Sequence, residues 1–353
     1  MKEIFKIPDN KKIHVIIDTD AACEADDPFA IAQALMSPKL IVKGILAEHF
    51  NEKGSTKRSY DEIKTVLHAM NKEDVPVFMG QEAPLSEDKN VSEGARFIID
   101  EAMRGGSSCA GCKTSGAVAS SEEASCDEAA PWNEKPWNEK KLYILCQGAI
   151  TNVAMALRTK PEIKDRIIII WIGTHGTKDI REFVRNTDCL ENADKSPQFV
   201  APPVPFREYN AGNDINAANE VLESGAELWL IPSYVYSTIT VGLAELKCKV
   251  APCGAIGRHL YENMIEYNLS DRAGWTQGES WALGDSPAIS VAINPGCGKY
   301  ISVKAPHINA DTSSSPKPDN PVIREYTYVD SRYVLEDFFA KLHLNFPPET
   351  EKL

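Results

Sequence analysis

The sequence lacks any apolar run that approaches the roughly 20 residues a helix needs to cross a bilayer. We also expect no secretion signal, because the first residues, M-K-E-I-F-K-I-P-D-N-K-K, hold neither a long apolar stretch nor a small-residue cleavage site. Positive charge is scarce, since 38 Lys and Arg stand against 51 Asp and Glu and give a formal net charge of −13. We therefore expect a cytoplasmic protein that binds neither membranes nor nucleic acids.

Regular cysteine spacing is absent as well. The nine cysteines occur at irregular intervals, some within apolar segments, as Cys146 and Cys248 do. This usage indicates reduced thiols and not a disulfide framework. Cys109 and Cys112 form C-A-G-C, but a zinc site needs four ligands and no fourth is evident nearby. We interpret them as an incidental pair in a loop.

What the sequence does contain is a repeated alternation of strand and helix patterns over 353 residues. The expected strands are residues 13–18, 40–47, 75–79, 142–146, 167–172 and 228–231. The expected helices are residues 27–36, 55–70, 92–103, 151–158, 214–224 and 286–293. This β-α-β order predicts an α/β fold in which helices flank a mainly parallel central sheet.

Two stretches interrupt the alternation. Residues 105–140 are rich in Gly, Ser, Ala and Glu and contain P-W-N-E-K twice, and residues 194–207 are rich in Pro. Because the strand and helix patterns resume after each, we interpret both as surface loops. We expect a single domain over residues 1–353, with a low-complexity surface insertion at about 105–140.

An unusually acidic turn follows the first expected strand. Residues 16–31 read I-I-D-T-D-A-A-C-E-A-D-D-P-F-A-I, with five carboxylates inside ten positions. Ligands of open parallel sheets bind beyond the carboxyl ends of the strands, so these side chains are expected to converge there. A divalent cation that prefers oxygen ligands would offset their repulsion. A simpler interpretation is that Asp27 caps a helix whose first turn holds Pro28, and that the rest are solvated turn residues.

Three later segments supply further polar groups at expected strand or helix ends. Residues 147–153 read Q-G-A-I-T-N-V, a glycine turn after a strand. Residues 208–219 read E-Y-N-A-G-N-D-I-N-A-A-N and are dense in side chains that hydrogen-bond sugar hydroxyls. Residues 281–289 read W-A-L-G-D-S-P-A-I, another acidic residue before a helix with Pro in its first turn.

Taken in order, these motifs resemble those of the inosine-uridine preferring nucleoside hydrolases, from about Ile13 to Ile293. The matching positions are Asp18, Asp20, Asp26 and Asp27, then Gly44 to Asn51, Thr151 and Asn152, Ile172 to Thr174, Glu208 to Asn210, Asp214 to Ala218, and Asp285 to Pro287.

The resemblance implies a calcium-dependent enzyme that cleaves the N-glycosidic bond of a ribonucleoside, or of a related ribosyl compound, in purine and pyrimidine salvage. It assigns the Ca²⁺ ligands to Asp20, Asp27, Asp285 and the backbone carbonyl of Thr151. It assigns the ribose hydroxyls to Asp26, Asn51, Glu208 and Asn210. Asp20 would also take the proton from a water bound to the calcium. Members of this family are generally homodimers or homotetramers, so self-association is expected too.

This sequence departs from the family pattern at two places. The turn between Asp20 and Asp26 is two residues longer, and it contains Cys23 and Glu24. We interpret Glu24 as an extra sugar or metal contact, or else a salt-bridge partner, and Cys23 as a packing residue. Gly284 stands where the family usually has a histidine that protonates the departing base.

Other residues offer substitutes for that histidine. His175 and His49 follow expected strands, although a structural role at a strand end is the simpler interpretation for each. Trp275 and Trp281 offer rings that would stack on a base, or that belong to the core.

Two other functions are compatible with the sequence. The first is a ribose- or nucleoside-binding protein of the same fold that has no turnover. The second is a magnesium-dependent phosphohydrolase in which Asp18, in the D-T-D motif, is the covalent nucleophile. Release of free base from nucleosides, compared with release of phosphate from phosphate esters, separates these alternatives from the hydrolase.

Overall fold

The computed structural model describes residues 5–104, 141–177, 207–274, 276 and 278–348. The insertion at 105–140 with Cys109 and Cys112, most of the Pro-rich segment, and Trp275 lie outside the described residues. No helix in the described ranges is both long and apolar enough to cross a membrane.

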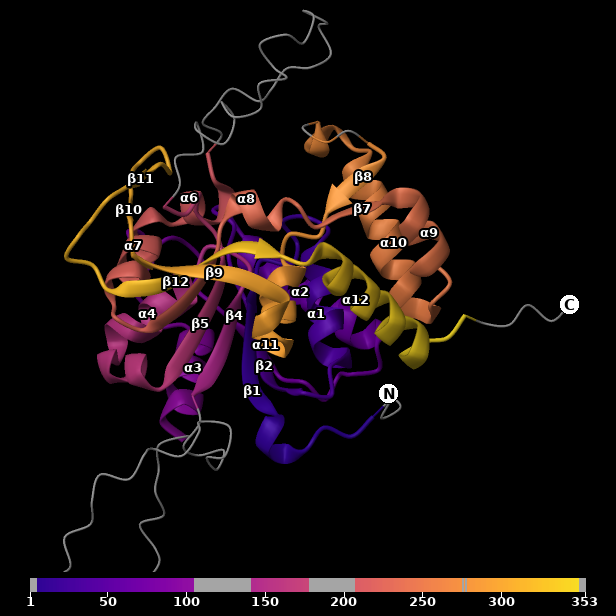
Figure 1. The fold of residues 1–353 in the computed structure, drawn as a ribbon, viewed down its shortest axis with the longest axis horizontal. Coiled ribbons are helices and arrows are strands. Elements are labelled where there is room, and N and C mark those ends of the chain that lie inside the picture. Colours follow the sequence, from indigo (N-terminus) through magenta and orange to yellow (C-terminus); the bar gives the residue numbers. More distant parts are fainter. Residues whose placement is uncertain (1–4, 105–140, 178–206, 275, 277, 349–353) are drawn as a thin grey trace, which may run out of the picture.

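Most of the described strands belong to one eight-stranded sheet at the centre of the molecule (Figure 1). In spatial order its strands are β3 (Val77–Met79), β2 (Leu40–Ala47), β1 (Ile13–Thr19), β4 (Leu142–Cys146), β5 (Ile167–Ile172), β6 (Glu227–Ile231), β12 (Val322–Val329) and β9 (Gly298–Lys304). All neighbours pair in parallel except β12 and β9, which pair antiparallel. This confirms the predicted α/β fold with a mainly parallel sheet.

Helices cover both faces of this sheet. One buried cluster packs the sheet against α1 (Asp27–Met36), α2 (Ser55–Ala69), α10 (Gly254–Asn268), α11 (Ser286–Ile293) and α12 (Ser331–Asn345). The other packs it against α3 (Glu93–Arg104), α4 (Thr151–Thr159) and α7 (Ile215–Glu223). In β5, Ile168, Ile170 and Ile172 join the first cluster, and Ile167, Ile169 and Trp171 the second. A strand buried on both faces must be apolar throughout, as this sequence is.

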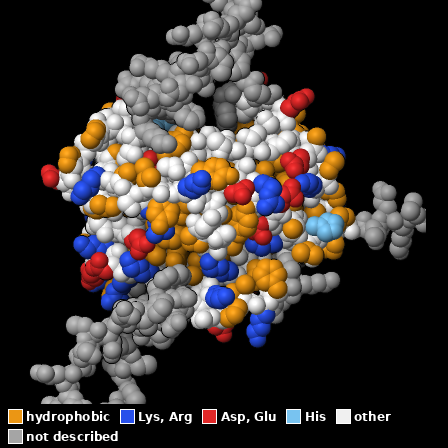
Figure 2. Space-filling view, viewed as in Figure 1, with side chains coloured by type: hydrophobic (Ala, Val, Ile, Leu, Met, Phe, Trp, Pro, Cys, Tyr) orange, Lys and Arg blue, Asp and Glu red, His pale blue; other side chains and the backbone are white. Residues whose placement is uncertain are grey.

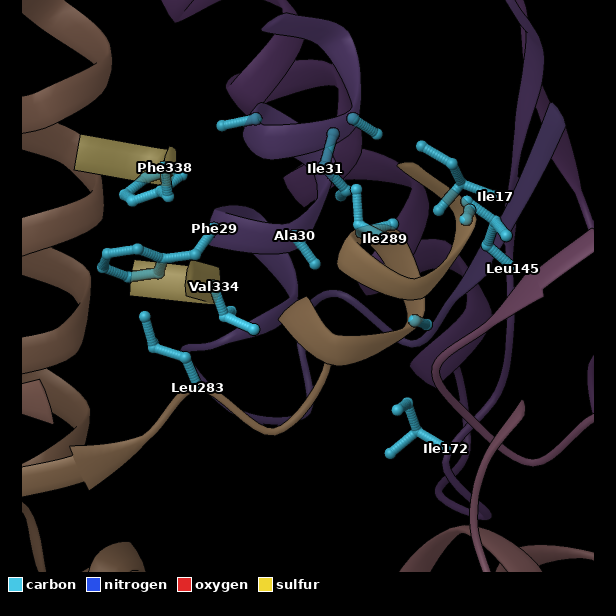
Figure 3. Close-up of a cluster of buried hydrophobic side chains, with 14 of the residues drawn as sticks. Ile17, Phe29, Ala30, Ile31, Leu145, Ile172, Leu283, Ile289, Val334 and Phe338 are labelled. Carbon is cyan, nitrogen blue, oxygen red and sulfur yellow. The ribbon is translucent and has the colours of Figure 1, made fainter. Parts of the chain in front are cut away.

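Helices α1 and α11 pack side by side although more than 250 residues separate them in the sequence. Figure 3 shows Ala30 and Ile31 of α1 close to Ile289 of α11, with Ile17 and Leu145 of the sheet beside them. The helices are also joined by polar contacts: the Gln33 amide donates to Ser290 Oγ (2.8 Å), and Lys39 donates to the carbonyls of Ala292 and Ile293. The two N-termini therefore open at the same end of the sheet.

The smaller elements lie around this framework. They are α6 (Tyr209–Asn213), α8 (Ser233–Tyr236), α9 (Leu243–Lys249) and the two-stranded sheets of β7 (Thr240–Gly242) with β8 (Ser280–Ala282) and β10 (His307–Ile308) with β11 (Ser314–Ser315). On the face shown in Figure 2, hydrophobic side chains and charges of both signs are interspersed.

The strand order reverses direction between β1 and β4. From β1 the chain proceeds outward through β2 and β3, and from β4 it proceeds the other way through β5 and β6. In doubly wound sheets a crevice opens at such a point, beyond the carboxyl ends of the two strands. The fold therefore places Asp20, just after β1, and Gln147, just after β4, at the position where a ligand is expected.

Candidate functional site

A cavity of about 490 Å³ opens at this position. Its lining residues come from the ends of β1, β4 and β5, from the starts of α1, α6 and α11, from both ends of α8 and from β8. They are Asp20, Cys23, Glu24, Asp26, Asp27, Gln147, Ile172, Arg207, Tyr209, Asn210, Ser233, Tyr236, Ser237, Trp281, Ala282, Gly284 and Asp285. Four of the aspartates predicted from the sequence therefore share one cavity. It is lined by aromatic rings as well as carboxylates, a combination suited to a ligand with a polar and an apolar part.

Three of these aspartates form the core of the site. Asp26, Asp27 and Asp285 each place one carboxylate oxygen within 4.8 Å of the others, and all three are buried. The charges of Asp26 and Asp27 add to burial in raising the pKa of Asp285, so the three carboxylates repel one another. Oxygen-only donors at this spacing fit a hard divalent cation, which would offset that repulsion.

The two helices that carry the cluster begin in the same way. Asp26 occupies the N-cap position of α1 and Asp285 that of α11, each with Pro in the first turn, and neither side chain makes a capping hydrogen bond. The prediction that Asp27 caps α1 is therefore wrong, since Asp27 is already helical. The reason is that the carboxylates have other partners: Asp26 Oδ2 accepts from the Gly284 N–H (2.9 Å), and Thr19 Oγ1 donates to Asp27 Oδ1. Both positive helix ends still face the cluster.

Asp20 lies next to this cluster on the sheet side. It is 3% exposed and rests against Gly148, where an added Cβ would come within 2.9 Å of Asp20 Oδ1. A glycine at 148 is therefore required for the carboxylate to approach the backbone after β4. Burial raises the pKa of Asp20 well above its usual range, and the charges of Asp27 and Glu48 add to this effect. A buried carboxyl with a raised pKa is a candidate general base.

The other acidic side chains that line the cavity also have raised pKa values. Burial raises the pKa of Asp27 to about 6 and that of Glu24 to about 7, the latter with a contribution from the Asp27 charge. Burial also raises the pKa values of Asp26 and Asp285 well above the usual range, and nearby carboxylates increase both. Without a cation, burial and mutual repulsion therefore favour the protonated forms of these carboxyls.

A second set of buried polar groups lies behind the cavity. The Asn152 amide donates to Asp18 Oδ1 (2.8 Å), and its backbone N–H donates to Glu48 Oε2 (3.1 Å). Burial raises the pKa of Asp18 to about 7 and that of Glu48 well above its usual range. Neither carboxyl lines the cavity. Both therefore support the strand ends and do not face a ligand.

Thr151 begins α4 within this supporting set. Its hydroxyl donates to Asp214 Oδ2 (3.1 Å) and lies 2.8 Å from His49 Nε2. Because His49 Nδ1 accepts the Asn51 N–H (3.1 Å), Nε2 must carry the ring proton and donate to Thr151. Burial lowers the pKa of His49 to about 4, so this imidazole is neutral. The Thr151 side chain is thus fully engaged, which leaves only its backbone carbonyl for the predicted cation contact.

Most residues predicted to contact ribose lie in or next to the cavity, and one lies outside it. Asn210 lines the cavity, and its Nδ2 donates to the carbonyls of Gln147 and Ile172 (both 2.9 Å), leaving Oδ1 for a ligand. Glu208 is buried just behind it, accepting from the Ala211 N–H (2.8 Å) and from the Tyr236 hydroxyl (3.0 Å). Asn51 is exposed, has φ 56°, and is not part of the lining.

Of the residues predicted to contact the departing base, one lines the cavity and another does not. Trp281 lines the cavity and packs edge-on against Tyr267, with centroids 5.4 Å apart. His175 is buried outside the lining, with Nδ1 2.7 Å from Ser233 Oγ. At Gly284 an added Cβ would lie 3.3 Å from the Tyr236 ring, so the tyrosine occupies the space beside the position where the family has histidine.

Tyr236 and Tyr209 are site residues that the sequence did not reveal. Tyr236 lies at the end of the short helix α8, in a segment without a recognisable pattern. Tyr209 is the middle residue of the E-Y-N motif, and its hydroxyl accepts from Cys23 Sγ (3.1 Å), which also lines the cavity. Cys23 itself is buried, in agreement with its interpretation as a packing residue.

The raised pKa values of the buried carboxyls, in the cluster and behind the cavity, predict how stability depends on pH. The folded-state pKa values of Asp18 and Asp27, about 7 and about 6, exceed the ordinary 3.8, so the native state binds protons that the unfolded chain releases. This stabilisation is complete below about pH 4 and is lost as the pH rises through 6 to 7. His49, with its lowered pKa, opposes the trend as the pH falls below about 6.5, but it is one group against several carboxyls.

We therefore expect the chelator-treated protein to melt about 3–5 °C lower at about pH 8 than at about pH 5.5. A saturating divalent cation should raise the melting temperature more at the higher pH, because it replaces protons the carboxyls no longer hold. Thermal unfolding with and without chelator checks both statements. A melting temperature of the chelated protein that climbs steadily from pH 5.5 to 8 would contradict them.

Comparison with known proteins agrees with this geometry. The family model described as inosine-uridine preferring nucleoside hydrolase matches residues 15–332. A search of curated protein sequences finds no significant match. Similar solved structures include a plant nucleoside hydrolase (17% identity, 94% of this chain and 98% of that one, TM-score 0.66) and a purine-preferring ribonucleoside hydrolase from Gardnerella vaginalis (19%, 95% and 99%, 0.62).

A third is the type III effector protein XopQ in complex with adenosine diphosphate ribose (14%, 96% and 94%, 0.56). At these identities the structures show a shared fold, whereas the family model spans most of the sequence. The chain belongs to the inosine-uridine preferring nucleoside hydrolase family and is an N-glycosyl hydrolase.

Proposed function

We propose that this protein hydrolyses the N-glycosidic bond of a ribonucleoside to a free base and ribose, and that it does so with Ca²⁺. The observation that carries the proposal is the position of Asp26, Asp27 and Asp285 at the starts of two helices. The N-cap side chains make no capping hydrogen bond, and one carboxylate oxygen of each of the three residues lies within 4.8 Å of the others. Such an arrangement costs stability unless a cation or a cationic transition state offsets it.

The cation ligands we propose are Asp20, Asp27, Asp285 and the Thr151 carbonyl. A Ca²⁺ ion held there would neutralise part of the acidic charge and favour ionisation of a water beside it. The fit rests on the donor set, which consists of oxygen atoms only, and on the burial of three carboxylates that each place one oxygen within 4.8 Å of the others.

The remaining steps use side chains of this protein. Asp20 takes the proton from the water that attacks the anomeric carbon. Cleavage of the bond to the base passes through an oxocarbenium-like state, whose positive charge the surrounding carboxylates stabilise. Asp26 offers the oxygen not taken by Gly284, and Asn210 offers Oδ1, to ribose hydroxyls. Glu208 holds the start of α6 and thereby positions Asn210.

Contacts around the departing base are also part of the proposal. Trp281 is the stacking partner, and Glu24 is an additional sugar or metal contact from the longer turn. His175 and Asn51 lie outside the lining and receive no role in it.

We propose in addition one domain over residues 1–353 and a homodimeric or homotetrameric assembly. The uninterrupted sheet supports the first point, and membership of the family supports the second. Light scattering of the purified protein measures the assembly directly.

A substrate panel tests the activity. We expect base release, followed by chromatography, from at least one of inosine, uridine, adenosine, guanosine and cytidine when Ca²⁺ is present. Adenosine diphosphate ribose belongs in the panel, because XopQ was solved with it. Binding of ribose without base release from any nucleoside would instead support the non-catalytic alternative.

The phosphohydrolase alternative meets an obstacle in the structure. Its nucleophile would be Asp18, which is 1% exposed, accepts from Asn152 and does not line the cavity. A phosphate ester such as p-nitrophenyl phosphate completes the panel, and we expect no release of phosphate from it.

A further inference from the structure

Gln147 directly follows β4, and its buried side-chain amide makes no hydrogen bond to the described residues. Its side chain is 1% exposed and lines the cavity, yet neither Nε2 nor Oε1 has a hydrogen-bond partner among the described residues. Its backbone is held firmly, because its N–H donates to the Asp18 carbonyl (2.8 Å) and its carbonyl accepts from Asn210 Nδ2 (2.9 Å). A buried polar group without a hydrogen-bond partner lowers the stability of the protein, so we expect a ligand in the cavity to supply the partner of this amide.

Other buried amides of the described chain do not share this condition. Asn152 donates to Asp18 and accepts from the Gln81 N–H (2.7 Å), and Gln81 is satisfied at both ends of its own amide. Gln33 and Asn213 each have one buried amide atom without a partner, and Gln33 still donates to Ser290. Within the described residues, only Gln147 has both atoms free.

The strand pattern shows which way the amide points. Tyr143 and Leu145 of β4 belong to the cluster on the α1 and α11 side, while the alternate residues belong to the other. Side chains alternate along a strand, so Gln147 continues the α1 and α11 side, where the aspartates lie. Asp18 pairs with Cys146, which places Gln147 alongside Thr19 and next to Asp20.

We propose that Gln147 hydrogen-bonds a hydroxyl group of the pentose, an inference that rests on the proposed function. Water attacks the anomeric carbon beside Asp20, so the sugar and not the base must occupy this part of the cavity. An amide offers one donor and one acceptor group, which match the donor and acceptor of a hydroxyl. It is also neutral, so it adds no repulsion among the carboxylates.

Replacement of Gln147 by Leu tests this assignment with a set of deoxynucleosides. The kcat/KM of Gln147→Leu should fall about 5- to 20-fold for the ribonucleoside, the range expected for loss of one such hydrogen bond. For the one analogue among the 2′-, 3′- and 5′-deoxynucleosides that lacks the contacted hydroxyl, wild type and variant should be nearly equal. Gln147→Met serves as a second variant of similar size.

Gln33→Leu is the matched control, a buried glutamine outside the cavity lining. It should alter thermal stability while leaving the ranking of deoxynucleosides unchanged. The proposal is overturned if Gln147→Leu and Gln147→Met keep the wild-type kcat/KM, or if their kcat/KM falls by the same factor for all the deoxynucleosides. It is also overturned if the size of the fall depends on which base the nucleoside carries.

A binding measurement separates this inference from the proposed activity. The affinity of free ribose in the presence of Ca²⁺, measured by calorimetry, should fall 5- to 20-fold in Gln147→Leu. If the wild-type protein hydrolyses no nucleoside, the proposed function fails, but the ribose affinities still decide the role of Gln147. Equal affinities of wild type and variant would overturn it even in an active enzyme.

Discussion

Asp20→Asn is expected to lower kcat for nucleoside hydrolysis by about 10³-fold or more while leaving the fold intact. Removal of a positioned general base typically costs 10²–10⁴-fold, and Asp20 also contributes to the proposed cation site. The amide has almost the same shape, so it keeps the contact with Gly148. Steady-state kinetics under saturating Ca²⁺ measures the loss.

The folded state of this variant is checked by circular dichroism and thermal unfolding. Because burial and neighbouring charges raise the pKa of Asp20, removing its charge should maintain or raise the melting temperature at neutral pH. Asp61→Asn, at an exposed position of α2, is the matched control and should retain wild-type activity. Near-wild-type turnover by Asp20→Asn would show that the base is another residue.

Asp285→Asn is expected to abolish both the response to Ca²⁺ and hydrolysis. The wild-type protein should gain about 4 °C in melting temperature when Ca²⁺ exceeds its Kd about 100-fold. The variant removes one of the three clustered carboxylates, so this gain should largely vanish, and kcat/KM should fall at least about 10³-fold. Differential scanning fluorimetry over a Ca²⁺ series, alongside the nucleoside assay, measures both effects.

The chelated form of the same variant provides a second check. Burial and the charges of Asp26 and Asp27 raise the pKa of Asp285, so its replacement by a neutral amide should stabilise the cation-free protein. A variant that is destabilised without Ca²⁺ but gains the full 4 °C with it would place the cation elsewhere. Lost activity in that case would reflect altered packing of α11.

Much of the fold followed from periodicity. The boundaries of β2, β4, β5 and α11 agree with the sequence-based expectations, because each is an apolar segment ended by Gly, Pro or polar residues. The exceptions are the elements between residues 233 and 282, among them the helices α9 and α10, and the elements after residue 293, none of which the sequence pattern predicted. Among the described strands, β9 pairs only with β12, and most of its side chains are exposed. Its residues therefore show neither the alternation nor the apolar run of a buried strand.

The acidic residues of the candidate site were predictable because both their side-chain chemistry and their positions at strand and helix ends can be seen in the sequence. Carboxylates at a strand end and before Pro-containing helix starts are visible in the sequence, and the cavity indeed contains Asp20, Asp26, Asp27 and Asp285. Their partners are not visible, because Gly284 binds Asp26 through its backbone N–H alone.

Contacts that depend on loop paths were also beyond the sequence. The motif match placed Asn51 near ribose, whereas the turn after β2 leaves it exposed with a left-handed backbone. The match could not reveal Tyr236 either, since only the folded path of α8 brings its ring next to Gly284.

The pairing of α1 with α11 has a consequence for biosynthesis. On the ribosome, Asp26 and Asp27 emerge early, but Asp285 and its helix follow more than 250 residues later. Until then the nascent chain holds an acidic turn with no counterpart and no complete site for a cation. On the proposed function, the growing polypeptide would not turn over substrate before Asp285 is in place, and capture of the ion would come late in its maturation.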